Sequence, residues 1–422
     1  MNFIYNQIEQ VRKGGISILF GKLCAIPLIL LALPVVFLVR ILRPLVVIRF
    51  ESLHSNRIGH FALDAELYLC ERDAGMHNSR SVDIFYYNGQ ISNYQLKRMW
   101  DRKLHICYFA KWVDRINRLL PGAQNHVVPM SSSRDIYGLF KDLAPHLSFT
   151  AAEERLGQEG LRTLGIPDGN PFVCFNARDS AYLETELSSK DWSYHNYRDS
   201  NIHNYLPAAE ELVRQGYFAI RMGVFVKERL NIANYKIIDY AVNYRTDFLD
   251  IYLGAKCRFF ICDTAGIYAI PMIFRRPIVW VNYIPLEHAP TWGTNHLFIP
   301  KKLWLRKERR FLTFREILYS GIGRFLKNEQ YEQMRIEVIE NTPEEITALV
   351  IEMDERLKGR WQDTEEDEEL QRCFWSIFKP SELNQVFLAR IGTEFLRQNQ
   401  ELLDLDTERR QSCKNIREIN LA

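Results

Sequence analysis

The sequence predicts an α/β protein with two domains, each built around a parallel sheet, with an apolar helix before them and helices after them. The chain has 422 residues, whereas a single hydrophobic core stops growing at about 250 to 300 residues. Short β-branched and aromatic runs alternate with segments whose apolar residues recur at helical spacing, a pattern typical of parallel sheets. Apolar residues make up 47% and charged residues 25% of the chain, which indicates that most of it folds.

The charge balance argues against one class of partner. The 54 Lys and Arg residues are offset by 52 Asp and Glu residues, so the formal net charge is only +2. Domains that bind nucleic acid usually carry a strong basic field. We therefore expect no nucleic-acid partner, and any anion must be bound by a local site.

An uninterrupted apolar run covers residues 23–39, with basic residues on both sides. It is slightly shorter than the roughly 20 residues of a membrane-spanning helix, and two prolines interrupt it. It has no small-residue cleavage site of a signal peptide. We expect residues 1–43 to form a peripheral or monotopic segment that contacts a membrane surface through residues 16–43. A true span and a buried core helix are the alternatives.

The first α/β domain is expected over residues 44–165. Two runs rich in β-branched or aromatic residues predict buried strands, at residues 45–50 and 82–87. Apolar residues at helical spacing predict helices at residues 61–71, 92–100 and 151–164. This order is the beginning of a parallel α/β sheet.

The second domain is expected over residues 166–350 and repeats the pattern more clearly. Strands are predicted at residues 172–175, 217–222, 258–262 and 278–282, and helices at residues 206–215, 246–255 and 265–273. This alternation indicates a doubly wound sheet. A helix over residues 342–357 follows, capped by Thr342, and residues 351–422 are expected to form a helical extension.

The turn after the strand at 258–262 is the first candidate site. Backbone amides at a helix start can hold a phosphate, Thr264 adds a hydroxyl, and Gly266 allows close approach. The alternative is that Asp263 or Thr264 only caps the helix. The position at the carboxyl end of a parallel strand favours a ligand site.

A second candidate site follows the strand at 172–175. Arg178 is expected at the carboxyl edge of that strand, where a guanidinium can bind a diphosphate through two hydrogen bonds. The alternative is that Arg178 pairs with Asp179 or Asp199 while the aromatic residues cover the sheet edge. Other side chains of this segment could contact sugar hydroxyls or a base: Asn176, His195, Tyr197, Arg198 and Asn201.

The first strand-to-helix turn reads SNRIGHF, residues 55–61. Arg57 and Gly59 fit the approach of a phosphate or sugar, and the His60 imidazole can serve as a general base. A structural histidine at a helix start is the alternative. Motifs of competing enzyme classes, such as G-x-S-x-G, H-E-x-x-H and G-K-S/T, do not occur in the sequence.

With these residues identified, the chain resembles a family of bacterial glycosyltransferases of surface-polysaccharide biosynthesis, which have the two-domain GT-B fold. The similar stretches cover roughly residues 45–375 and occur in the same order: RIGHFALDAELYL, FNARDSAYL, DWSYHNYRDSNIHNY, GYFAIRMG, TDFLDIYLGAKCRFFICDTAGIYAIP, RRPIVWVNYIP and ENTPEEI. The resemblance implies two Rossmann-like domains facing a cleft. It also implies transfer of a sugar from a nucleotide-sugar donor to a glycan or lipid-linked acceptor, at the cytoplasmic face of the inner membrane.

The matching motifs assign residues to each substrate. The donor side comprises Arg178, Tyr197, Arg198, Asn201, Thr264 and Gly266, and the acceptor side comprises Arg57, Gly59 and His60. The resemblance implies no metal and no cofactor, so leaving-group charge would be neutralised by Arg178, by Arg198 or Lys227, and by the amides at 264–266. Asp263 departs from the family pattern, because a carboxylate beside a diphosphate repels it unless it points away or binds a ribose hydroxyl.

Two other functions stay open at this point. The chain could be a catalytically inactive, membrane-associated scaffold of an envelope polysaccharide pathway, or a sugar-nucleotide epimerase on the same fold. Fold alone does not choose among them. Binding of a nucleotide sugar would exclude the scaffold, and conversion of the donor without an acceptor would identify the epimerase.

Overall fold

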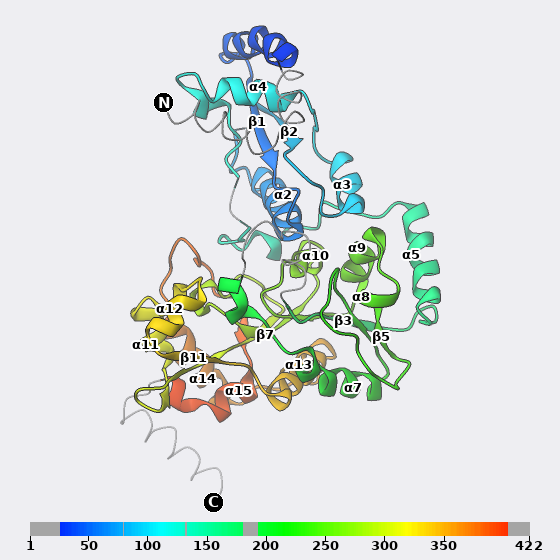
Figure 1. Cartoon of the computed structure of the whole chain (residues 1–422), viewed down its shortest axis with the longest axis vertical. Helices are drawn as coiled ribbons and strands as arrows, with labels where there is room; N and C mark the ends of the chain where they lie inside the picture. Colours follow the sequence, from blue (N-terminus) through cyan, green and yellow to red (C-terminus); the bar gives the residue numbers. More distant parts are fainter. Residues whose placement is uncertain (1–25, 79, 131–132, 180–192, 404–422) are drawn as a thin grey trace, which may run out of the picture. The chain divides into compact units, whose positions relative to one another are not determined.

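The computed structural model describes residues 26–78, 80–130, 133–179 and 193–403 (Figure 1). The chain divides into two compact units, unit 1 (Met1–Ser132) and unit 2 (Ser133–Ala422). Each unit contains a parallel sheet with helices, so the predicted α/β class is confirmed. None of the helices in the described part of the chain has the length and apolar character needed to cross a membrane.

Unit 1 is built around two parallel strands, β1 (Val47–Leu53) and β2 (Ser81–Tyr87). The sequence predicted both strands and the helices that follow them. It did not predict α4, whose short apolar pattern lies in a segment rich in charged residues. The helices of unit 1 after the N-terminal helix (residues 26–41) are α2 (Ile58–Asp73), α3 (Tyr94–Asp101) and α4 (Ala110–Asn117).

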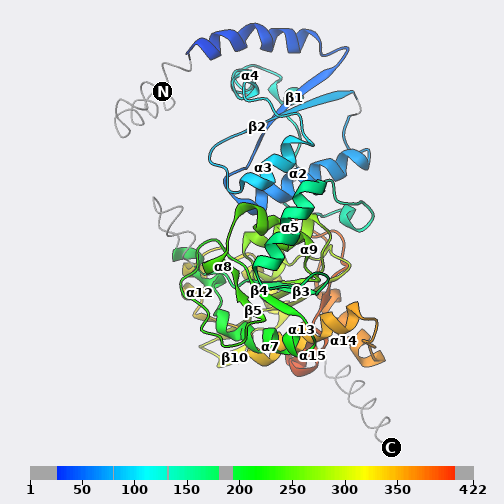
Figure 2. The ribbon, with the colours of Figure 1, turned by 90° about the vertical axis from the view of Figure 1, so that its right-hand side faces the viewer.

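The two faces of the β1–β2 sheet are covered by different helices (Figures 1 and 2). On one face, Tyr68 of α2 meets Phe85 edge to face, with ring centroids 5.0 Å apart. On the other face, the neighbouring Tyr86 packs with α4 and the N-terminal helix, because successive strand residues point to opposite faces. The buried residues of this second cluster are Ala32, Val36, Val39, Phe50, Tyr86, Ala110, Val113 and Ile116.

A buried ion pair joins the strands of unit 1. Arg49 on β1 donates two hydrogen bonds to Asp83 on β2, at 2.6 and 2.7 Å, and the Tyr68 hydroxyl donates a third at 2.5 Å. Burial alone would raise the pKa of Asp83, but the hydrogen bonds from Arg49 and Tyr68 outweigh it and lower that pKa. The pair therefore fixes α2 against both strands.

Unit 2 contains a seven-stranded parallel sheet in the order β12-β8-β7-β6-β3-β4-β5. When the strands of this sheet are numbered along the chain from β3 to β8, they follow the 3-2-1-4-5-6 order of a doubly wound sheet. In such sheets, ligands bind where the strand order reverses. That switch point lies between β3 and β6. The strands are β3 (Phe172–Phe175), β4 (Phe218–Arg221), β5 (Ile237–Asp239), β6 (Phe260–Cys262), β7 (Ile278–Tyr283), β8 (His296–Pro300) and β12 (Arg390–Ile391).

The helices of unit 2 connect these strands and extend beyond them. They are α5 (Ala151–Thr163), α7 (Leu206–Arg214), α8 (Tyr240–Asn243), α9 (Asp247–Lys256), α10 (Ala269–Ile273), α11 (Phe314–Tyr319), α12 (Asn328–Gln333), α13 (Pro343–Leu357), α14 (Glu365–Ile377) and α15 (Thr393–Gln398). A small antiparallel sheet comprises β9 (Lys302–Leu305), β10 (Arg310–Phe311) and β11 (Ile336–Ile339). The predicted helices and strands after residue 165 all have counterparts here, apart from the helix start at 265.

Helix α5 belongs to unit 2, although the sequence placed it in the first domain. Gly157 lies against the Tyr252 ring of α9, where an added Cβ would sit 2.1 Å from the ring carbon Cζ. Glu154 accepts hydrogen bonds from Lys256 at 2.7 Å and from the Tyr252 hydroxyl at 3.2 Å. The turn-rich stretch at residues 165–171, where the sequence placed the boundary between the two domains, is the short connection from α5 to β3.

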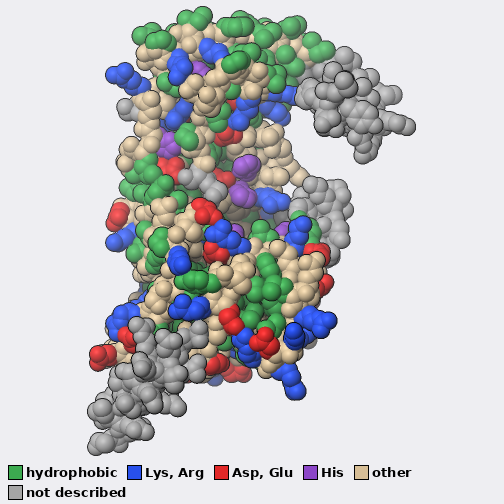
Figure 3. Space-filling model, turned by 90° about the vertical axis from the view of Figure 1, so that its left-hand side faces the viewer, with side chains coloured by type: hydrophobic (Ala, Val, Ile, Leu, Met, Phe, Trp, Pro, Cys, Tyr) green, Lys and Arg blue, Asp and Glu red, His purple; other side chains and the backbone are tan. Residues whose placement is uncertain are grey.

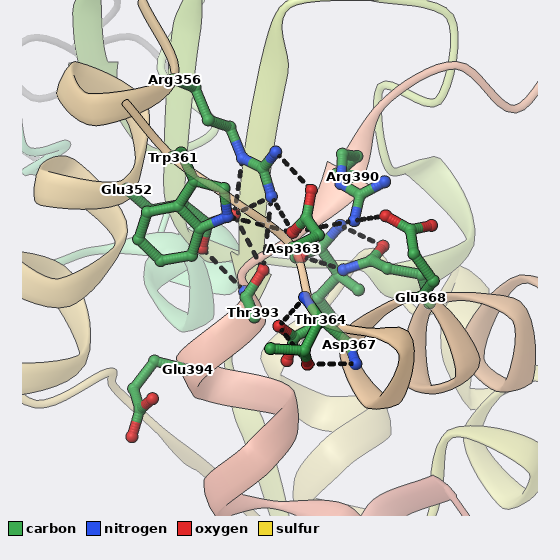
Figure 4. A network of polar contacts seen from close by, with 12 residues as sticks. Glu352, Arg356, Trp361, Asp363, Thr364, Asp367, Glu368, Arg390, Thr393 and Glu394 are labelled. Carbon is green, nitrogen blue, oxygen red and sulfur yellow. Dashed lines mark hydrogen bonds and ion pairs between the residues drawn. The ribbon is translucent and has the colours of Figure 1, made fainter. Parts of the chain in front are cut away.

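Residues 351–403, the described part of the predicted extension, are an integral part of unit 2. Figure 4 shows Arg356 of α13 between Glu352 and Asp363, with hydrogen bonds of 2.8 and 2.6 Å to the Asp363 carboxylate. Arg390 donates to Glu368 of α14 at 2.8 Å. Since β12 also pairs with β8, this region completes the sheet instead of forming a separate extension.

Candidate functional site

The carboxyl ends of β3 and β6 are hydrogen-bonded neighbours at the switch point. The loops that follow them carry most of the charged and polar residues predicted from the sequence. We call the following set the switch-point site: Asn176, Arg178, Arg198, Asp199, Asp263, Thr264, Gly266 and Lys301. The structure thus brings together the two segments that the sequence singled out separately.

Asp263 ties the two loops of the switch-point site to each other. Its side chain is fully buried, and it accepts the backbone amides of Arg178 at 2.7 Å and Ala265 at 3.1 Å. Burial raises the pKa of this carboxyl, although hydrogen bonds and nearby cations oppose the effect. The expected contact of Asp263 with a substrate is therefore corrected, because its carboxylate faces the protein and positions the backbone of both loops.

Arg178 and Asp199 form a partly buried ion pair. The Arg178 guanidinium donates to the Asp199 carboxylate and, at 3.2 Å, to the carbonyl of His195. Burial raises the pKa of Asp199 to about 6 and lowers the pKa of Arg178, with the charge of Arg198 adding to the second effect. Both directions mean that desolvation outweighs the attraction, so the pair contributes little net stability.

Arg198 lies over the turn after β6. It donates from Nε to the Thr264 hydroxyl at 2.9 Å and from Nη2 to the Thr264 carbonyl. The exposed Gly266 begins a 3-10 turn (Gly266–Tyr268), and the α-helix α10 starts only at Ala269. The α-helix start predicted at residue 265 is corrected, because a 3-10 turn precedes α10. The polar groups at this turn are the Arg198 guanidinium and the first amides of the turn.

Lys301 is a buried cation that sequence reasoning missed. Its ammonium donates to the carbonyls of Asp199 at 2.6 Å and Tyr197 at 3.2 Å. Burial lowers its pKa. The residue directly follows β8, a strand the sequence did not predict, and the apolar run LFIP before KK was the available signal.

Several predicted ligand residues support the backbone of the site. The Asn176 side chain donates to the Met222 carbonyl at 2.9 Å. Asn201 accepts the amide of His203 at 2.9 Å and caps a 3-10 turn (Ile202–Tyr205). Tyr197 is buried, with its ring 5.2 Å from that of Tyr331. His195 packs against Tyr194, with ring centroids 4.0 Å apart. Residues 180–192, also part of this predicted cluster, lie outside the described residues.

We expect Asp199→Asn to show the titration of this carboxyl directly. The pKa of this carboxyl is raised from 3.8 to about 6, so ionised Asp199 destabilises the folded state. This loss of stability is absent below pH 3.8 and fully present above pH 6. The free energy of unfolding of wild type minus that of the variant should rise by about 1.4 kcal/mol from pH 7 to pH 5. Urea unfolding at each pH measures this difference, and a flat or falling difference would contradict the raised pKa.

In unit 1, two histidines share one carboxylate near the start of α2. The Nδ1 atoms of His54 and His60 lie 3.2 and 3.4 Å from the same Asp64 oxygen. The Asp64 side chain is 8% exposed, whereas those of His54 and His60 are 67% and 44% exposed. Arg57 is the exposed residue before α2, and Gly59 lies in its first turn.

This arrangement suits a general base. When Nδ1–H of His60 donates to Asp64, the lone pair on Nε2 is available to accept a proton. Asp64 follows His60 by one helical turn, a spacing visible in the sequence that the sequence reasoning did not use. The structure therefore adds Asp64 and His54 to the predicted Arg57, Gly59 and His60.

The same three side chains could also hold a metal ion. His54, His60 and Asp64 offer ligand atoms that all lie within 4.8 Å of one another. Two imidazoles and one carboxylate are a ligand set that Zn²⁺ accepts. The expectation that the chain uses no metal therefore stays a prediction, and it is tested by chelation below.

Two glycosyltransferases are among the solved structures to which the chain is similar. The glycosyl transferase family 9 protein from Veillonella parvula superposes with a TM-score of 0.41 and 12% identity, over 74% of this chain and 96% of that chain. ADP-heptose LPS heptosyltransferase II from E. coli superposes with a TM-score of 0.35 and 11% identity, over 60% of this chain and 90% of that chain. No protein-family model matches the chain, and no curated protein matches it.

Proposed function

We propose that the chain is a glycosyltransferase that moves a sugar from a nucleotide-sugar donor to a surface-glycan or lipid-linked acceptor. The observation that carries the proposal is the grouping of Arg178, Arg198 and Lys301 around the switch point of a doubly wound sheet. A nucleoside diphosphate leaving group carries charge that such cations stabilise. The motif resemblance found in the sequence supports sugar transfer as the reaction.

In the proposed reaction, unit 2 binds the donor. Arg178 exchanges Asp199 for the diphosphate, and Arg198 adds a second guanidinium beside the first amides of the turn at Gly266. These groups hold the negative charge that develops on the diphosphate as the bond from its oxygen to the sugar breaks. Asp263 keeps both loops in place, because it accepts an amide from each of them.

Unit 1 supplies the base in this proposal. His60 removes the proton of the acceptor hydroxyl through Nε2, and Asp64 fixes the imidazole through Nδ1. The deprotonated oxygen then forms the new bond to the sugar. Arg57 and Gly59, at the start of α2, are the proposed acceptor contacts.

The first test of this proposal is donor binding by wild type. Thermal shift with a panel of UDP-, GDP-, ADP- and CMP-sugars at pH 7.5 should raise Tm with at least one of them, because a ligand that binds only the folded state stabilises it. Asp199→Asn should bind the same compound more tightly, by about tenfold, since the competing carboxylate is gone.

The outcomes of this screen separate the proposed function from its alternatives. Wild type without a shift for any nucleotide sugar would favour an inactive scaffold and contradict the proposal. Donor conversion to a new sugar nucleotide in the absence of any acceptor would identify an epimerase. Release of nucleoside diphosphate that depends on an added glycan acceptor would support sugar transfer.

A further inference from the structure

The N-terminal helix (residues 26–41) has an unusual distribution of side chains. Its inner residues Ala32, Val36 and Val39 are buried in the core of unit 1. Its outward residues are also apolar, and five of them are between 54% and 73% exposed. We call these five the outer face: Leu30, Leu31, Phe37, Leu38 and Ile41.

Unit 1 exposes further apolar side chains, next to this helix or next to α4 in the sequence. Leu45, shortly after the helix, and Leu119, shortly after α4, are each 77% exposed. Tyr108, just before α4, is also exposed. Figure 3 shows hydrophobic side chains gathered on the part of unit 1 that carries this helix, with Lys and Arg side chains close to them. A patch of this kind marks an interaction site in a folded protein.

The charged residues of the N-terminal helix and of the turn that follows it are all basic. Residues 26–46 contain Arg40 and Arg43 and no Asp or Glu. Arg40 donates to the Asn117 side chain at 2.8 Å and to the Pro121 carbonyl at 2.7 Å, which joins the helix to the end of α4. Arg43 is exposed, and basic residues beside an apolar surface favour anionic lipid headgroups.

Two features indicate how deep the outer face can enter a membrane. The inner residues hold the helix against the β1–β2 sheet, so it lies flat on unit 1 (Figure 2). Pro34 has no N–H and cannot donate to the Leu30 carbonyl one turn earlier. An unpaired carbonyl is costly in hydrocarbon, where no water is present, and this favours the level of the headgroups.

We propose that the outer face docks unit 1 on an anionic lipid bilayer, with the N-terminal helix parallel to the membrane plane. The partner is the lipid surface, since a wholly apolar exposed helix face bordered by basic residues fits the boundary between acyl chains and anionic headgroups. This inference concerns a surface apart from the switch-point site, and it does not depend on the proposed function.

Vesicle flotation with the full chain tests this docking surface. Wild type should float with vesicles of phosphatidylglycerol and phosphatidylethanolamine and should float less with phosphatidylcholine alone. The triple variant Leu31→Glu/Phe37→Glu/Leu38→Glu should lose at least tenfold in the bound fraction, because charged side chains do not enter the apolar layer. Arg43→Glu should weaken binding to the anionic vesicles only.

The matched control carries the same change in charge on unit 2. Leu156, Leu326 and Met334 are exposed apolar residues of unit 2, so Leu156→Glu/Leu326→Glu/Met334→Glu should float like wild type. Far-UV circular dichroism should be unchanged in both triple variants, since all six side chains are exposed.

Wild type that stays unbound with every vesicle would overturn the proposal. The proposal would also be overturned if the triple variant of the helix bound vesicles like wild type but changed a dimer to a monomer in light scattering. That result would identify a second copy of the chain as the occupant of the outer face.

Discussion

Arg178→Met/Asp199→Asn is expected to lower kcat/KM for the nucleotide-sugar donor by at least about 100-fold relative to Asp199→Asn alone. The single variant keeps the guanidinium and removes the carboxylate that occupies it. The double variant removes both charges of the partly buried pair, so it leaves neither ion without its partner. The comparison therefore isolates the interaction of Arg178 with the diphosphate. Steady-state rates with the donor identified by thermal shift measure the effect.

The design separates loss of function from loss of fold. Arg178→Ala alone would leave the partly buried Asp199 carboxylate without its guanidinium partner, which destabilises the chain for reasons unrelated to the substrate. Equal Tm values for Asp199→Asn and the double variant would establish that both are folded. If the double variant then turned over the donor at the rate of Asp199→Asn, Arg178 would have no part in charge stabilisation.

His60→Gln is expected to lower kcat by about 10² to 10⁴-fold, the range typical of a lost general base. The thermal shift with the donor should stay as in wild type, because the variant leaves unit 2 unchanged. Asp64→Asn should have a smaller effect on kcat, since the imidazole remains but loses the acceptor that fixes its Nδ1 proton. His54→Gln should change kcat little and serves as the matched control.

Chelation distinguishes the base from a metal ligand. A His60 that acts as a base predicts that EDTA leaves the rate of wild type unchanged. Loss of activity with EDTA, its return with Zn²⁺, and an equal effect of His54→Gln and His60→Gln would show that the two histidines and Asp64 form a metal site. That pattern would contradict the role of His60 as base.

Much of the second sheet could be predicted because its strands are buried on both faces. Such strands read as continuous apolar runs, as in RFFIC and IVWVN, and the polar turns after them mark the carboxyl edge. The sequence therefore predicted the segments around Arg178 and Thr264. It could not show that the first strand of the unit lies beside the fourth, since strand order depends on long-range pairing.

The roles within the site were harder to predict than its location. Asp263 was identified as a possible ligand contact, but whether a carboxylate points outward or accepts two backbone amides depends on the path of the loop from β3. Lys301 was missed because its strand, β8, was not predicted. Several of the side chains around residue 197 that were predicted to contact a ligand form hydrogen bonds within the chain instead. No sequence pattern distinguishes a side chain that binds a ligand from one that supports the backbone.

The packing of the N-terminal helix limits how the protein can be shortened for expression. Removing an apolar N-terminal segment is a common way to improve the yield of a membrane-attached enzyme. Here Ala32, Val36 and Val39 complete the interior of unit 1. Deletion of residues 1–43 would therefore remove part of the cover over Phe50 and Tyr86 and leave α4 alone on that face of the sheet. A variant that keeps the helix and carries polar substitutions only on its outer face should remain folded in detergent-free buffer.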